Sequence, residues 1–126
     1  MEKRIYYYDT DSAGVVYYAN YLKYLEEART EFLEERGISV KELAAQGTLF
    51  VVARQEIDYK SPAFYADILK INTRIADISA VKIGFAYEIK NQSGKIICTA
   101  RTVMVCVGTD FKPKTIPRKI REAIER

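Results

Sequence analysis

The hydrophobic pattern of the chain changes period once, and this change limits the folds that are open to it. Between residues 20 and 36, apolar side chains recur at helical spacing. The stripe consists of Tyr21, Leu25, Ala28 and Phe32. From residue 48 to residue 107, apolar and polar residues alternate instead, as they do in half-buried strands. The order predicts one long amphipathic helix followed by a series of strands.

The alternating part divides into extended segments separated by short turns. The predicted strands cover residues 48–60, 67–78, 81–91 and 95–107. The motif "NQSG" at 91–94 is a tight hairpin turn with glycine where a positive φ is favoured. Because a parallel pair needs a crossover of a dozen or more residues, these neighbours must be antiparallel. The β-branched and aromatic segment 3–9 predicts a short first strand.

Capping residues set the expected helix boundaries. Asn20 is a plausible N-cap and Gly37 a plausible C-cap of the long helix. Ser39 and Glu42 match a capping box, which predicts a short second helix. Pro117 should open a short C-terminal helix.

An antiparallel sheet must bury one apolar face, and the long helix is the element that can cover it. We therefore expect a single α+β domain over residues 1–126, in which a curved antiparallel sheet of about five strands wraps around a central helix. A length of 126 residues suits one domain, and 48% hydrophobic with 29% charged residues excludes a disordered chain.

No apolar run approaches a membrane span and no signal peptide is apparent, so we expect a cytoplasmic protein.

The absence of histidine narrows the chemistry. Without it no Cys/His metal set can form, and Cys98 and Cys106 are expected to be small buried hydrophobes. No EF-hand loop or Asp-rich magnesium motif is present, so we expect neither metal nor cofactor. The remaining catalytic candidates are carboxylates, lysines and tyrosines.

The segment "YYYDTDSAGVVYYANY" at 6–21 places Asp9 and Asp11 just before the long helix, whose first amides lack internal partners. Each carboxylate could close an Asx turn or cap the helix, which is the common use of Asp in such loops. Alternatively, an amide at the helix start could hold the oxygen of a polarised carbonyl while a carboxylate attacks the carbon or deprotonates a water. The residues alone leave both uses open.

The longer segment "YYYDTDSAGVVYYANYLKYLEEAR" resembles the signature segment of the 4-hydroxybenzoyl-CoA thioesterase family of hotdog-fold enzymes, most closely its Tol-Pal-associated acyl-CoA thioesterase branch. "EIDYKSPAFYADILKINTRI" at 56–75 is similar to the family's second-strand segment, and "TARTVMVCV" with a later "IP" to its closing strand and tail. The resemblance covers nearly the whole chain. It implies a hotdog fold and hydrolysis of an acyl-CoA, or acyl-carrier-protein, thioester to a free acid and a thiol.

In that family the catalytic carboxylate lies three residues before the glycine, which corresponds to Asp11, and Asp9 is left as a loop or capping residue. The amide that polarises the carbonyl corresponds to the backbone of Tyr18. Relatives often carry histidine at this position, so a proton-transfer role for that histidine is not open to this chain. The candidate substrate-binding residues are Tyr7, Gly14, Val15, Val16, Asn20 and Tyr21, although these tyrosines could also be packing residues and Asn20 a cap.

The resemblance also implies a homo-oligomer, a dimer or a tetramer of paired dimers, with active sites at the dimer interface. Glu26 and Arg29 are spaced to form a helical ion pair. The basic tail could contact coenzyme A phosphates or an acidic carrier protein, or could be a solvated face. It contains Lys112, Lys114, Arg118, Lys119, Arg121 and Arg126.

Three other functions remain as alternatives. A non-catalytic acyl-thioester-binding or interaction module would use Asp11 only as a cap. Hydratases of this fold rely on histidine, which the chain lacks. Nucleic-acid binding is not expected, because no groove-reading motif accompanies the basic tail.

Overall fold

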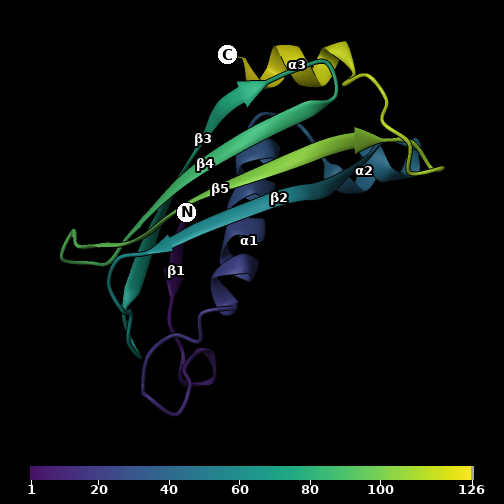
Figure 1. Ribbon diagram of the computed structural model, residues 1–126. Coiled ribbons are helices and arrows are strands. Elements are labelled where there is room, and N and C mark those ends of the chain that lie inside the picture. The colour runs from purple at the N-terminus through teal and green to yellow at the C-terminus, as the bar shows by residue number, and fades with distance from the viewer. Residues whose placement is uncertain (126) are drawn as a thin grey trace.

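The computed structural model describes residues 1–125 as an antiparallel sheet that curves around one long helix (Figure 1). The elements are β1 (Glu2–Arg4), the 3-10 turn η1 (Tyr7–Asp9), α1 (Asn20–Glu34), α2 (Val40–Ala45), β2 (Leu49–Tyr59), β3 (Ile68–Ile78), β4 (Lys82–Lys90), β5 (Ile96–Val107) and α3 (Arg118–Ile124). The sheet has five strands in the order β1-β3-β4-β5-β2, and every neighbouring pair is antiparallel. The predicted α+β architecture is confirmed. No helix within the described residues combines the length and the apolarity needed to cross a membrane.

The apolar stripe of α1 packs on the inner face of the sheet. Its buried residues are Tyr21, Tyr24, Leu25, Ala28, Phe32 and Leu33. The ring of Phe32 meets the ring of Phe85 in β4 edge-on, with 6.1 Å between the centroids. The predicted stripe is therefore confirmed, and Tyr24 joins it.

The C-terminal end of α1 confirms the expectation for Gly37. This residue has φ +77°, and its N–H donates to Glu34 O, while the N–H of Ile38 donates to Leu33 O. This is the Schellman pattern, and it is completed by the burial of both Leu33 and Ile38.

The N-terminal end of α1 differs from the prediction. Ala19 occupies the N-cap position without a side-chain cap, and Asn20 is the first helical residue. The Asn20 side chain donates instead to Asp9 O, at 2.8 Å. The prediction that Asn20 caps the helix was wrong because its amide is used to hold the preceding loop.

The smaller turn signals are largely confirmed. Ser39 Oγ accepts a hydrogen bond from the Glu42 N–H at 3.2 Å, which is the serine half of the predicted capping box. Asn91 and Gly94 close the β4–β5 hairpin, and Gly94 has φ +80°. Pro117 is the N-cap of α3 rather than its first helical residue.

The predicted first strand over 3–9 is too long. Pairing with β3 ends at Arg4, and the chain then turns through η1. The cause is Asp9, whose Oδ2 accepts a hydrogen bond from the Tyr6 N–H at 2.8 Å and pulls the chain out of the extended conformation. The resulting loop lies at the N-terminal end of α1 (Figure 1).

β2 is an edge strand with an irregular register. Its pairing with β5 shifts between Val52 and Arg54, so a bulge lies at Ala53. Before the bulge the inward side chains are at even positions, and after it they are at odd positions, as the pairing with β5 shows. In β5, alternate residues from Cys98 to Cys106 are buried, which confirms that both cysteines act as small buried hydrophobes.

Candidate active site

Asp11 lies at the tip of a tight turn in the loop before α1. Its backbone carbonyl accepts from the Gly14 N–H and its Oδ1 accepts from the Ala13 N–H, both at 2.9 Å. Gly14 has φ +82°, which permits the turn, and a bridge between Thr10 and Val16 closes the base of the loop. The carboxylate is exposed, and its Oδ2 makes no hydrogen bond within residues 1–125. The turn therefore fixes one oxygen and leaves the other open.

Asp9 is used quite differently. Its side chain is 6% exposed, and Oδ1 accepts a hydrogen bond from the Tyr24 hydroxyl at 2.7 Å. Its backbone carbonyl accepts from the Tyr17 N–H and from the Asn20 side chain. With Oδ2 on the Tyr6 N–H, all its acceptors are engaged, so Asp9 is a structural residue of the loop, as the family resemblance implied.

The backbone of Tyr18 stands at the start of α1. Tyr18 directly precedes the N-cap Ala19, and among the described residues its N–H has no hydrogen-bond acceptor. Its carbonyl accepts from the Tyr59 hydroxyl at 3.1 Å, and its ring packs 4.9 Å from that of Tyr17. The amide is thus held by its neighbours but free to bind an oxygen.

The substrate-binding candidates separate into groups. Val16 and Tyr21 are buried, and the Tyr21 ring lies 5.6 Å from that of Tyr59. Val15 is half-buried and bridges to Phe64. Tyr7 is 79% exposed and lies to one side, 6.0 Å from the ring of Tyr65.

Tyr59 was missed by the sequence analysis, although its hydroxyl holds the backbone of Tyr18. The residue is 41 positions from Tyr18 along the chain, and only the bulge in β2 turns it towards the helix. Nothing in the local pattern marks the contact.

Several buried side chains of this region hold their protons more tightly than they would in water. Burial is the main factor that raises the pKa of Tyr21, Tyr24 and Tyr59 above their ordinary value. Burial also raises the pKa of the Cys98 thiol to about 12, so this thiol is not a nucleophile. These three tyrosines therefore stay protonated and serve as hydrogen-bond donors.

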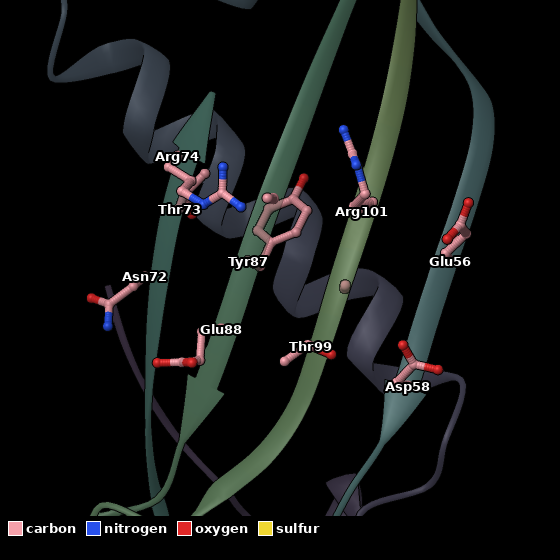
Figure 2. A pocket seen from close by; sticks show the side chains of 11 residues that line it. Glu56, Asp58, Asn72, Thr73, Arg74, Tyr87, Glu88, Thr99 and Arg101 are labelled. Atoms are coloured by element: carbon pink, nitrogen blue, oxygen red, sulfur yellow. The ribbon is translucent and has the colours of Figure 1, made fainter. Parts of the chain in front are cut away.

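A polar cavity of about 490 Å³ lies on the opposite face of the sheet, away from α1 (Figure 2). In Figure 2, side chains such as Glu56, Asp58, Arg74 and Glu88 extend from β2, β3 and β4, and α1 lies behind the sheet. Glu56 pairs with Arg54 and Glu88 with Lys90, so part of the charge is neutralised locally. No cluster of three or more metal-binding side chains occurs in the described part of the chain. The cavity therefore contains charged side chains, but among the described residues it does not combine a carboxylate with a free backbone amide as Asp11 and Tyr18 do.

Two expectations about charge can be checked. Glu26 and Arg29 do not form the predicted ion pair; both side chains line a cavity beside α1 instead. In the tail, Arg118 pairs with Glu122 at 2.7 Å and Arg121 with Glu125 at 3.7 Å, which favours a solvated helix face. Arg126, also part of that prediction, lies outside the described residues.

A five-stranded antiparallel sheet curved around one helix, with an aspartate turn at the helix start, defines a protein of the hotdog class. The family model of the Thioesterase-like superfamily matches residues 6–124, and the chain belongs to this family. It is a thioester hydrolase by class, as the resemblance implied.

The curated relatives agree. The acyl-CoA thioester hydrolase YbgC of Escherichia coli O157:H7 is 36% identical over 118 residues, which cover 93% of this chain and 88% of that protein. The acyl-CoA thioesterase YbgC of Haemophilus influenzae is 33% identical, and the match covers 95% of this chain and 89% of that one.

Solved structures share the fold. The DHNA-CoA thioesterase of Staphylococcus aureus superposes with a TM-score of 0.94 at 30% identity, covering 99% of this chain and 87% of that chain. A 1,4-dihydroxy-2-naphthoyl-CoA thioesterase of Synechocystis gives a TM-score of 0.92 at 29% identity, covering 98% and 93%. The predicted hotdog fold is confirmed.

Proposed function

We propose that this chain is an acyl-CoA thioesterase in which Asp11 supplies the catalytic carboxylate and the Tyr18 amide stabilises the oxyanion. The observation that carries the proposal is the pairing, in one loop, of an exposed carboxylate with an open oxygen and an amide without an acceptor. The named activity of the curated relatives supports the substrate class.

The chemistry needs little more than these two groups. The Asp11 carboxylate either attacks the thioester carbon or removes a proton from the water that attacks it. Negative charge develops on the carbonyl oxygen and is stabilised by the Tyr18 N–H at the start of α1. The carbon–sulfur bond then breaks and the thiolate leaves. If Asp11 attacked the carbon itself, water next hydrolyses the anhydride between Asp11 and the acyl group, which frees the carboxylate. In both routes the water's hydroxyl ends on the acid and its proton on the thiolate. Because a thiolate leaves without strong protonation, the lack of histidine does not prevent the reaction.

We divide the substrate-binding candidates by exposure. Gly14, Val15 and Tyr7 are accessible and suit direct contact with substrate; no atom lies within 4 Å of the place where a Gly14 side chain would begin. Val16 and Tyr21 are buried, and Asn20 is bonded to Asp9, so these three support the loop from below.

A dimer would complete the site. β2 is an edge strand, and an exposed edge tends to pair with another chain. We infer that two copies join their β2 edges about a two-fold axis, and that tetramers form from such dimers. The ion pairs of Arg118 and Arg121 weaken the case for an acidic carrier protein as partner. Association with the Tol-Pal system stays a prediction from the resemblance.

The test is release of free thiol from a panel of acyl-CoAs by the wild type and by Asp11→Asn. Asparagine keeps a side-chain oxygen for the Ala13 N–H, so the turn should survive. We expect kcat to fall by about a hundredfold or more with the circular dichroism spectrum unchanged. A folded Asp11→Asn protein with full activity would contradict the catalytic assignment. A wild type that binds acyl-CoA but hydrolyses none would favour the binding module.

A further inference from the structure

β1 is much shorter than β3 and covers only one end of it (Figure 1). The pairing ends at Lys70, and Met1 then exchanges two backbone hydrogen bonds with Ile71. Because backbone groups alternate along a strand, those of Thr73 and Ile75 point the same way as those of Ile71. Among residues 1–125 no strand lies beside them on that side. This stretch, from Thr73 to Ile75, is a free edge with backbone groups available to an added strand.

A polar groove of about 210 Å³ lies between this edge and the C-terminal half of α1. Glu31 and Glu35 line it from the helix, and both are exposed. Within the described part of the chain Glu31 forms no ion pair, and Glu35 has only Arg36 at 4.0 Å. Arg36 is itself held against the helix, 3.5 Å from the centre of the Phe32 ring and hydrogen-bonded to Phe32 O. The groove therefore presents two carboxylates whose charge is little neutralised.

The contact between β1 and α1 indicates what an added strand should carry. Lys3 pairs with Glu27, with 3.8 Å between Nζ and Oε1, and Met1 lies further along, in the groove with Glu31 and Glu35. Going back along β1 therefore means going forward along α1. Two strand residues span about 6.7 Å and four helix residues about 6 Å, so the two spacings match. A strand that continues the line of β1 would bring its inward side chains to Glu31 and Glu35.

We propose that the free edge of β3 binds an extended peptide with lysine or arginine at alternate positions, as a sixth strand of the sheet. The peptide runs antiparallel to β3, its backbone bonds to Thr73 and Ile75, and its basic side chains pair with Glu31 and Glu35. A second copy of the chain fits less well, because a two-fold axis would set these glutamates against each other. The edge lies at the opposite end of the sheet from β2, so the dimer proposed above leaves it accessible.

Two peptides of about seven residues, blocked at both ends, test the charge. One alternates threonine with lysine, and the other alternates threonine with glutamate. Calorimetric titration should show binding of the lysine peptide, and binding at least about tenfold weaker for the glutamate peptide. Hydrogen exchange followed by NMR should slow by about tenfold or more at the Thr73 and Ile75 amides when the lysine peptide is bound. No binding of the lysine peptide would overturn the inference.

Methylation of the peptide backbone distinguishes strand addition from simple attraction between charges. In the proposed register the N–H groups of the lysines bond to β3, whereas those of the threonines point to solvent. N-methylation of the lysines should therefore weaken binding by about tenfold or more, and N-methylation of the threonines by less than about threefold. Equal affinities of the two methylated peptides would contradict strand addition.

Charge reversal on the protein tests the groove. Glu31→Lys and Glu35→Lys should each weaken binding of the lysine peptide by about threefold or more, and the double variant by about tenfold or more. Glu26→Lys is the matched control, because Glu26 lines the cavity on the β2 side of α1 and not the groove. Its affinity for the peptide should stay near the wild-type value. A folded double variant that binds as well as the wild type would overturn the inference.

The free protein tests the competing occupant. If the Thr73 and Ile75 amides are already protected without peptide, and dilution removes this protection, the edge is paired with a second copy and the inference is overturned. All these measurements report binding at the far end of α1 from Asp11. Failure of the inference would therefore leave thiol release unchanged, whereas failure of the proposed function would leave peptide binding unchanged.

Discussion

The hydroxyl of Tyr24 donates a hydrogen bond of 2.7 Å to Asp9 Oδ1, and this buried contact ties the loop before α1 to the second turn of that helix. The two aspartates of the loop therefore have different roles. Asp9 anchors the loop, while Asp11, two residues further on, keeps an oxygen open to solvent.

Tyr24→Phe should loosen this anchor. Phenylalanine fills the same space but leaves one carboxylate oxygen of Asp9 without its donor, which costs about 1–3 kcal/mol. We expect a lower Tm, measured by circular dichroism, and a parallel loss of thioesterase activity. Tyr7→Phe is the control, because the Tyr7 side chain is 79% exposed and should not affect Tm. Equal Tm values for both variants would mean that the anchor contributes nothing.

Tyr18→Phe should have almost no effect on turnover, because the proposed role belongs to the backbone amide. Tyr59→Phe should be worse, since it removes the hydroxyl that holds Tyr18 O at 3.1 Å. We expect kcat to fall by about two- to fivefold in Tyr59→Phe, as for the loss of one hydrogen bond. Steady-state thiol release checks both variants. The reverse order would implicate the Tyr18 hydroxyl in the reaction.

The fold should lose stability in alkali. The pKa of Cys98 is raised by burial from 9.0 to about 12, so the folded state holds this proton more tightly than the unfolded state. The resulting stabilisation is complete below pH 9 and is lost progressively as pH rises towards 12. Buried Tyr24 shifts in the same direction. Urea unfolding between pH 7 and pH 11 should show this decline, and Cys98→Ala should make it shallower.

Gly84 allows an ion pair to cross the sheet. Arg101 of β5 and Asp77 of β3 pair at 2.9 Å over β4, where a side chain at Gly84 would overlap the Asp77 carboxylate. Gly84→Ala should therefore cost no more than this exposed pair, about 1 kcal/mol or less. A double-mutant cycle with Asp77→Ala checks this: the second substitution should add little to the first. Fully additive losses would show that Gly84 is needed for another reason.

The secondary structure was largely predictable because its signals are local. The four strands after residue 48 and the stripe of α1 follow from hydrophobic period, and Gly37 from its place after the helix. The first strand was overestimated because the Asp9 carboxylate accepts a hydrogen bond from the Tyr6 N–H and ends the extended segment. The same carboxylate is held in place by Tyr24 of α1, a contact that no local pattern reveals.

The site was predictable only in part. The sequence placed Asp9 and Asp11 before α1 but could not distinguish an anchor from an open carboxylate, and the preference for Asp11 came from the resemblance. The structure adds the burial that separates the two aspartates. Tyr59 escaped notice because its direction depends on an irregularity in a distant strand.

Because of this bulge, the fold depends on the number of residues in β2 as well as on their identity. The extra residue at Ala53 turns Gln55, Ile57 and Tyr59 inward and leaves Arg54, Glu56 and Asp58 outside. Loss of a single codon there would exchange the two sets and bring three charges against α1. Many conservative substitutions within β2 would keep this arrangement, whereas the deletion or insertion of a single residue would not. We expect natural variation in this strand to consist of substitutions, and length changes to be confined to the connecting loops.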